Sequence, residues 1–182
     1  MLWITSTGRF SSSLIPVREA LRNLETEGLV TFFPNKGAYV STLSQTAMRE
    51  IFQTRIFLEQ GALELSIPHL QEVDFRQAEN ALCKLDSART GKDLSHFNRI
   101  FHHTLYSRSG NDYLIALINT LHSNIERYMR RYLSDHYNNE HSQTTHRKIL
   151  QASRRGDVTQ AKATLRLHME TAVQRLIALL PQ

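Results

Sequence analysis

The stretch SSLIPVREALRNLETEGLV, residues 12–30, predicts an amphipathic helix close to the start of the chain. Pro16 suits the first turn of a helix, and Gly28 ends the helical pattern. Between them, apolar residues recur at helical spacing at Val17, Ala20, Leu21 and Leu24. The opposite face carries donors for phosphates and base edges, namely Arg18, Arg22 and Asn23. The spacing of the arginines alone favours an ordinary solvated helix face.

A β-hairpin is predicted directly after this helix. The segment LVTFFPNKGAYVSTL, residues 29–43, alternates apolar and polar residues on either side of a turn that begins at Pro34. Asn35, Lys36 and the backbone of Gly37 lie at the tip of the hairpin, where they are available to an adjacent DNA groove. Helix and hairpin together have the layout of a partial winged helix, which we assign to residues 1–43.

The rest of the chain, residues 44–182, is predicted to be an all-α bundle, so that the fold as a whole is mainly α. Helices are expected at about 44–67, 72–88, 94–108 and 112–136, with Ser44 as the N-cap of the first. Two further helices are expected on either side of RRGD at 154–157. The segment GKD at 91–93 is expected to be a break between helices.

Composition sets limits on the class of protein. The 182 residues are 41% hydrophobic, enough for a sizeable core, and 22 Lys and Arg against 17 Asp and Glu leave a formal net charge of +5. This charge permits contact with DNA without proving it. A single cysteine, Cys83, allows no disulfide within the chain, and we expect it to be a buried small apolar residue. The opening MLWI is too short for a signal or membrane segment, which favours a cytoplasmic protein.

Histidines in the bundle indicate a metal site. Asn98 and His102 lie four residues apart and share one helix face. On one continuous helix, His146 and His168 would be separated by roughly 33 Å, too far to share an ion. A helical hairpin bent at 156–157, with Asp157 as an N-cap, returns the two histidines to the same level.

Asn98, His102, His146 and His168 are then expected to converge on one divalent cation, Zn²⁺ or Ni²⁺, with open positions for water or an acidic ligand. The other histidines are assigned to the surface or to a satisfied core: His69, His96, His103, His122, His136 and His141.

The sequence PVREALRNLETEGLV followed by PNKGAYV resembles the recognition helix and wing of the GntR family of bacterial transcription regulators. The resemblance implies that Arg18 contacts DNA from the recognition helix and that Gly37 lets the wing approach the DNA backbone. The resemblance assigns a DNA-contacting role to Arg22 and Lys36 less directly. The family usually has Ser-Arg-Thr before PVREAL, so Leu14 stands where a DNA-contacting arginine is expected, which lowers the expected affinity.

The GntR resemblance also implies two helices ahead of the recognition helix, where this chain has MLWITSTGRFSS. We therefore expect an incomplete DNA-binding head, in which Val17, Leu21 and Leu24 lack their usual packing partners.

The bundle resembles the FCD domain, the ligand-binding half of FadR-type GntR regulators. The resemblance rests on FQTRIFLEQGALEL, NRIFHHTLYSRSGNDYL and HRKILQASRRGDVTQAKATLRLHME. It implies a metal that completes its coordination with the carboxylate of a small organic acid. The first ligand of the family is commonly Asp, so Asn98 removes one negative charge. Arg55 is the candidate cation for the acid, and a structural ion pair with Glu59 at i+4 is an equally weighted alternative.

These observations predict a homodimeric, DNA-binding transcriptional regulator that senses a small organic acid through a bound divalent metal. One alternative is a truncated sensor or dimerisation protein that no longer binds DNA specifically. A metal-dependent hydrolase is the other, and it needs a general base beside the metal. The neighbouring segments offer Tyr106, Asn111 and arginines but no such carboxylate, so we expect no enzyme activity.

Overall fold

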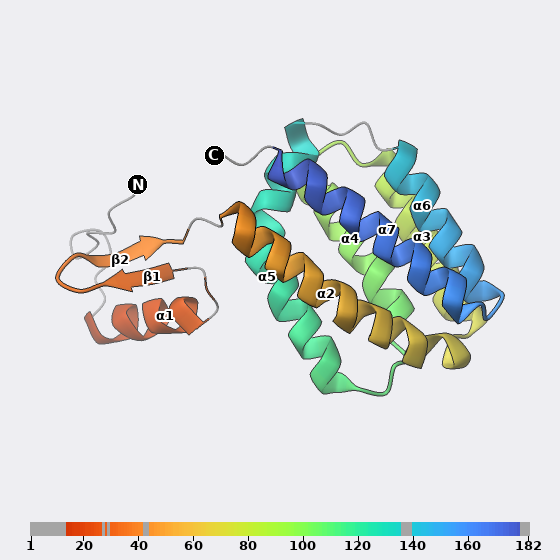
Figure 1. Ribbon diagram of the computed structural model, residues 1–182, viewed down its shortest axis with the longest axis horizontal. Coiled ribbons are helices and arrows are strands. Elements are labelled where there is room, and N and C mark those ends of the chain that lie inside the picture. Colours follow the sequence, from red (N-terminus) through yellow and green to blue (C-terminus); the bar gives the residue numbers. More distant parts are fainter. Residues whose placement is uncertain (1–13, 27, 29, 42–43, 136–139, 179–182) are drawn as a thin grey trace. The chain divides into compact units, whose positions relative to one another are not determined.

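The computed structural model describes residues 14–26, 28, 30–41, 44–135 and 140–178, drawn as coloured ribbon in Figure 1. Within these ranges, the side chains of residues 14, 127, 129–135 and 140–141 are left undescribed. The chain divides into two compact units, Met1–Ser44 and Gln45–Gln182. His136, and the side chain of His141, lie outside the described part, so the assignments made for them stay predictions.

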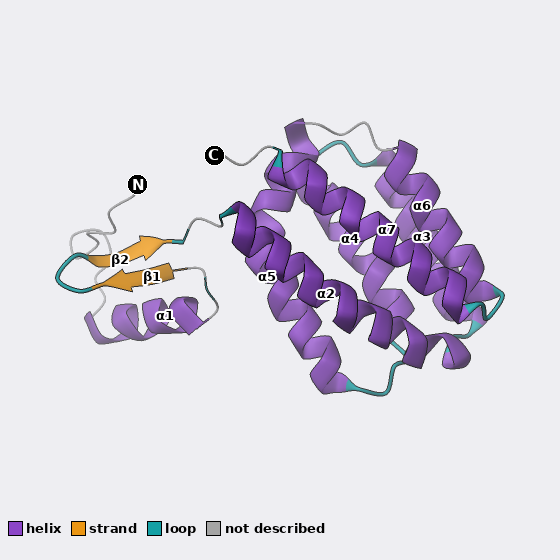
Figure 2. Cartoon of the chain, viewed as in Figure 1, coloured by secondary structure: helices purple, strands orange, loops and turns teal. Residues whose placement is uncertain are grey.

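The small unit is a helix followed by a hairpin. Helix α1 spans Leu14–Thr26 and packs on strand β1, Val30–Phe33, which pairs antiparallel with β2, Gly37–Val40. The turn between the strands uses left-handed backbone at Asn35, with φ 58°, and at Gly37, with φ 84°. Figure 2 shows that strands occur in this unit while the other is built from helices.

The large unit is a helical bundle, which confirms the predicted mainly α fold. Its elements are α2 (Gln45–Ser66), a 3₁₀ turn (Ile67–His69), α3 (Glu72–Ser87), α4 (Gly91–Tyr106), α5 (Asp112–Asp135), α6 (Glu140–Arg154) and α7 (Val158–Ile177). Helix α2 packs on α7, α3 on α4, α4 on α5, and α6 on α7 (Figure 1). These contacts bring α2, α4 and the α6–α7 pair around one core.

The start of α4 differs from the prediction. GKD was expected to be a break, but it forms the first turn of α4, because the Thr90 side chain caps the helix by accepting the Asp93 N–H at 3.1 Å. Asp93 also places a negative charge in the first turn, which favours the helix dipole. The break between α3 and α4 instead lies at residues 88–90, after Ser87.

The core is formed by large side chains from several helices, among them Met48, Leu63, Phe101, Leu105 and Tyr106. The expectation that Cys83 is buried was wrong: it is exposed on α3. The inward face of α3 is set by Ala78, Leu82 and Leu85, and the residue after Leu82 is turned about 100° away from that face.

In the described part of the chain, every helix is too short or too polar to cross a membrane.

The turn between α6 and α7 has the predicted chemistry. Gly156 adopts φ 70°, and the Asp157 side chain accepts the Gln160 N–H at 2.9 Å as the N-cap of α7. The two helices therefore form an antiparallel hairpin, and the ring centroids of His146 and His168 lie 4.3 Å apart.

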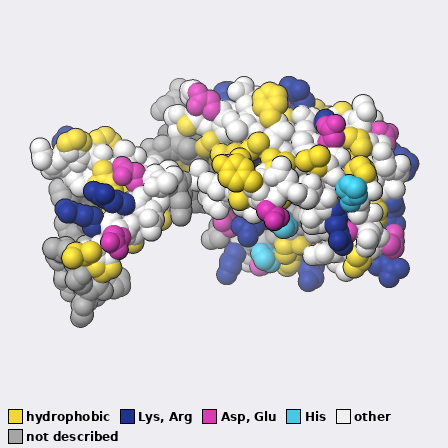
Figure 3. Space-filling view, turned by 90° about the horizontal axis from the view of Figure 1, so that it is seen from below, with side chains coloured by type: hydrophobic (Ala, Val, Ile, Leu, Met, Phe, Trp, Pro, Cys, Tyr) yellow, Lys and Arg dark blue, Asp and Glu magenta, His cyan; other side chains and the backbone are white. Residues whose placement is uncertain are grey.

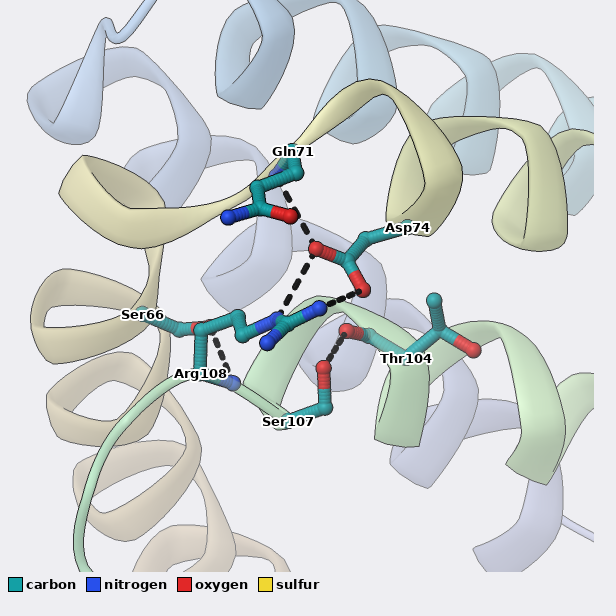
Figure 4. Close-up of polar contacts among 6 residues, drawn as sticks. All are labelled: Ser66, Gln71, Asp74, Thr104, Ser107 and Arg108. Atoms are coloured by element: carbon teal, nitrogen blue, oxygen red, sulfur yellow. Dashed lines mark hydrogen bonds and ion pairs between the residues drawn. The ribbon is translucent and has the colours of Figure 1, made fainter.

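A polar cluster joins the end of α2, the start of α3 and the end of α4 (Figure 4). The Arg108 guanidinium donates to Asp74 at 3.0 and 3.2 Å, and the Arg108 backbone N–H donates to the Ser66 hydroxyl at 3.0 Å. Asp74 also accepts the Gln71 N–H as part of the capping box of α3. Burial raises the pKa of Asp74, but the hydrogen bonds from Arg108 and Gln71 outweigh it and hold that pKa below its ordinary value.

Replacing Asp74 with Asn is expected to lower the free energy of unfolding at neutral pH by about 1 kcal/mol, since the half-exposed Arg108 is partly screened by solvent. A depressed carboxyl pKa stabilises the fold above the unfolded-state pKa, and the stabilisation disappears as the pH falls through the folded-state pKa. Denaturant unfolding of both proteins from neutral pH to about pH 2 should thus give stabilities that converge at low pH. Glu50→Gln, at an exposed position on α2, is the control. A constant difference at every pH would contradict the assignment.

Candidate functional site

Three histidines from three helices meet inside the bundle. His102 on α4, His146 on α6 and His168 on α7 each offer a ring nitrogen, and these atoms lie within 4.8 Å of one another. The Nε2 atoms of His102 and His146 are 3.2 Å apart. Two nitrogens bound to one Zn²⁺ at about 2.0–2.1 Å in tetrahedral geometry are separated by about 3.3–3.4 Å, so this spacing fits a shared ion.

Each of the three rings has an oxygen beside its Nδ1 atom. His102 Nδ1 lies 3.3 Å from the Tyr106 hydroxyl, and His168 Nδ1 lies 3.0 Å from the Thr145 hydroxyl. His146 Nδ1 faces the Gln143 side-chain oxygen at the longer distance of 3.5 Å. An acceptor at Nδ1 favours the tautomer with its proton on that atom, which leaves the Nε2 lone pair available to a metal.

The direction of these hydrogen bonds follows from their neighbours. Tyr106 donates its hydroxyl proton to Glu59 Oε2 at 2.7 Å, so its oxygen can only accept from His102. Burial and the Glu59 charge raise the pKa of Tyr106 well above its ordinary value, which keeps this donor protonated. Thr145 likewise donates to the Ser142 carbonyl at 2.8 Å and is left to accept from His168.

The buried rings are also held neutral. Burial lowers the pKa of His102 well below its ordinary value, and the nearby His146 and His168 rings lower it further. Burial and the neighbouring His168 have the same effect on the pKa of His146. Neutral imidazoles keep the lone pairs that metal ligation requires, so the donor set fits a divalent ion of the Zn²⁺ or Ni²⁺ type.

A cavity of about 20 Å³ lies beside the cluster, with room for about one water-sized group. Its polar lining includes Asn98, Arg55 and Glu59 as well as His102 and His168. Asn98 lines this cavity together with His102 and His168, while its role as a metal ligand stays a prediction. The remaining predicted ligand, His146, is fully buried, with its Nε2 atom 3.2 Å from that of His102.

Arg55 lines the cavity and is also paired with Glu59. Its Nε and Nη2 atoms lie 2.8 and 2.7 Å from Glu59 Oε1, and both side chains are buried. The ion pair between Arg55 and Glu59, one of the two roles expected for Arg55, is thus present. Its contact with an organic acid stays a prediction. The expectation that no carboxylate lies near the site was wrong, because α2 brings Glu59 to it. Both oxygens of Glu59 accept hydrogen bonds, one from Arg55 and the other from Tyr106.

His122, like Glu59, is a site residue that the sequence pattern did not reveal. It was assigned to the surface or a satisfied core, but it lines the cavity from α5 with 6% of its surface exposed. Its Nε2 atom is buried and has no hydrogen-bond partner among the described residues. The spacing of His122 from the other histidines along the chain gave no signal, since α5 reaches the cavity only through tertiary packing. His69, His96 and His103 are exposed, as expected.

The proposed DNA-contacting residues lie at the surface of the small unit, where Figure 3 shows basic side chains. Arg18 and Arg22 are exposed one turn apart on α1, and Lys36 and Gly37 are exposed in the hairpin turn. An added Cβ at Gly37 would meet nothing within 4 Å, so the positive φ is the reason this position favours glycine. The apolar face of α1 is covered in part, because Val17, Leu21 and Leu24 are half-buried.

Known families match both units. The FCD domain family matches residues 50–171, and the bacterial regulatory proteins of the gntR family match residues 7–40. The chain belongs to the GntR family of regulators with an FCD domain. This family binds DNA operators and regulates transcription.

Individual GntR relatives agree with this assignment. A GntR family regulator of Pseudomonas syringae has a similar structure, with a TM-score of 0.69 and 32% identity over 93% of this chain and 71% of that one. The transcriptional repressor GlaR of Escherichia coli is 27% identical over 92% of this chain and 81% of its own length. The fold of E. coli McbR/YncC is also similar, with a TM-score of 0.78 and 24% identity over 91% and 81% of the two chains. Since the named relatives are regulators, they give no support to a hydrolase.

The tautomer of His102 can be tested without a metal. In the metal-free protein, we expect ¹⁵N NMR to find His102 neutral with its proton on Nδ1, because the Tyr106 oxygen accepts it. Tyr106→Phe removes that acceptor and should shift His102 toward the Nε2-protonated form. Tyr113→Phe, at an exposed tyrosine on α5, is the matched control and should leave the signal unchanged. If His102 of the wild-type protein carries its proton on Nε2, the proposed direction of the hydrogen bonds from His102 to Tyr106 and from Tyr106 to Glu59 is wrong.

Proposed function

We propose that this GntR regulator holds a divalent metal on Asn98, His102, His146 and His168 and senses a small organic acid at that metal. The observation that carries the proposal is the close approach of ring nitrogens from His102, His146 and His168, together with an oxygen beside each Nδ1 atom. Converging lone pairs without a shared proton or cation repel one another, so this arrangement favours a bound ion. Zn²⁺ and Ni²⁺ both suit three imidazoles and one amide oxygen.

The charge of the site supports an acidic effector. Three neutral imidazoles and the amide of Asn98 supply no negative charge, and the carboxylate of Glu59 is already paired with Arg55. A bound divalent metal would supply open coordination positions and an unbalanced positive charge. A small carboxylate balances that charge, whereas a neutral ligand does not.

Arg55 has a refined role in this proposal. Its guanidinium lies at the cavity wall and is paired with Glu59, so it balances the Glu59 charge and leaves a partial positive potential for the acid. An effector carboxylate that competes for Arg55 would disturb Glu59, Tyr106 and His102 in turn. This chain of contacts gives α2 and α4 different arrangements with and without the acid, which is what a sensor requires.

The DNA-binding part of the proposal assigns phosphate or base contacts to Arg18, Arg22 and Lys36 and a turn role to Gly37. A symmetric operator is read by a two-fold protein, so we propose a cytoplasmic homodimer of the FadR-type subfamily. Leu14, at the position where the family carries a DNA-contacting arginine, keeps a second candidate open: a sensor that no longer discriminates DNA sequences. The enzyme alternative is not pursued, because Glu59 has both oxygens occupied and is a poor general base.

Loss of one central ligand tests the metal site. His146→Ala is expected to reduce bound metal from one ion per chain to almost none, because it removes one of the three ring nitrogens that lie within 4.8 Å of one another. Metal content after gel filtration, measured by mass spectrometry, gives the answer. His69→Ala removes an exposed histidine and should keep the full stoichiometry. Equal metal content in wild type and His146→Ala would contradict the site.

Fluorescence anisotropy with promoter DNA and scrambled DNA tests the DNA contacts. Arg18→Ala is expected to weaken the promoter complex by about 1–3 kcal/mol and to reduce the preference over scrambled DNA. Lys92→Ala removes an equal charge from an exposed site on α4 and should leave the preference intact. Titrations at two salt concentrations separate phosphate attraction from base readout. If both DNAs bind equally weakly to the wild type, the second candidate replaces the first.

A further inference from the structure

The Nε2 atom of His122 is a buried polar atom without a hydrogen bond to any described residue. A group removed from water in this way is costly unless a partner arrives, so such atoms commonly mark a missing ligand or water. His122 lines the same cavity as Asn98, His102 and His168, with 6% of its own surface exposed. The cavity is therefore where a ligand or water could form the hydrogen bond that His122 Nε2 lacks.

The three clustered histidines differ from His122 in one respect. Each of them has an oxygen at Nδ1, whereas the buried Nε2 atom of His122 has no hydrogen-bond partner among the described residues. His122 is also absent from the group of rings whose nitrogens lie within 4.8 Å of one another. Its role is therefore distinct from that of the metal ligands. Burial and the charges of Arg55 and Arg99 lower the pKa of His122, so its ring is neutral and carries one N–H.

Resting on the proposed function, we propose that His122 is the second anchor of the effector. Its Nε2–H donates a hydrogen bond to one oxygen of a carboxylate whose other oxygen faces the metal position. Arg55 and Asn98 line the remaining wall. The cavity of about 20 Å³ has room for about one water-sized group, so a carboxylate enters only if the lining side chains move, and a bulky acid is disfavoured. The effector class is thus a compact carboxylic acid that enters with its carboxylate first.

This arrangement separates two kinds of anion. Acetate has two oxygens and can reach both the metal position and His122. Chloride has one atom and needs only the metal position. A residue that merely supports the packing of α5 would affect both anions equally, whereas an anchor for the second oxygen affects acetate alone.

The test uses the full chain loaded with one equivalent of Co²⁺, whose visible spectrum reports changes in coordination. Acetate and chloride are titrated into the wild type, His122→Phe, His122→Gln and the control His69→Leu. His122→Phe keeps a ring of similar size without the N–H, and His122→Gln restores a donor. We expect His122→Phe to keep one metal per chain and to raise the Kd for acetate by about tenfold or more, with the Kd for chloride unchanged. His122→Gln should recover part of the loss, and His69→Leu should match the wild type.

Four results would overturn the inference. These are an acetate Kd in His122→Phe equal to that of the wild type, an equal weakening of acetate and chloride, loss of the metal in His122→Phe, and no acetate response in the loaded wild type. If His122→Phe does not fold, the inference rests on His122→Gln, and the same acetate-specific change, of smaller size, is required. Failure of the wild type to hold metal is a separate outcome, which removes the proposed metal site and the inference with it.

Discussion

Three imidazoles that meet inside the bundle are the constraint on which the rest of the site depends. Their nitrogen lone pairs repel one another unless a shared proton or cation lies between them, and each ring is fixed from its other nitrogen. Tyr106 and Thr145 provide that fixation at two of the rings, and each is itself oriented by a further acceptor. These contacts explain why a polar side chain such as Thr145, which does not line the cavity, is nevertheless buried in the bundle: it orients the ring of His168.

The network also connects the site to the scaffold. Glu59 and Arg55 are one turn apart on α2, Tyr106 and His102 are one turn apart on α4, and Glu59 joins the two helices through the Tyr106 hydroxyl. Removing one partner would leave a buried charge or hydroxyl unpaired, so the pairs depend on one another more than their individual energies indicate. A ligand that contacts Arg55 or His102 would therefore disturb hydrogen bonds of both α2 and α4. This coupling is the physical basis for sensing in the proposed function.

Much of this arrangement follows from the sequence. The turn chemistry of Gly156 and Asp157 predicted the hairpin that brings His146 to His168, and helical spacing placed Asn98 with His102. Local patterns of this kind are readable because each depends on residues within a few turns of one another. Glu59 and His122 were missed as site residues because their place in the site depends on how α2 and α5 pack against α4 and α7. The same limit applies to Cys83, whose side chain faces solvent because the rotation of α3 is set by its neighbours, and the start of α4 was missed because the Thr90 cap was overlooked.

The most direct test of the account is anomalous X-ray diffraction from crystals of the chain loaded with Zn²⁺ or Ni²⁺, with data collected on both sides of the absorption edge of the metal. The proposed metal site requires one strong anomalous peak per chain between the Nε2 atoms of His102, His146 and His168, with the Asn98 side-chain oxygen beside it. A peak bound through any Nδ1 atom of these rings, a peak elsewhere on the protein, or no peak at full metal loading would contradict it.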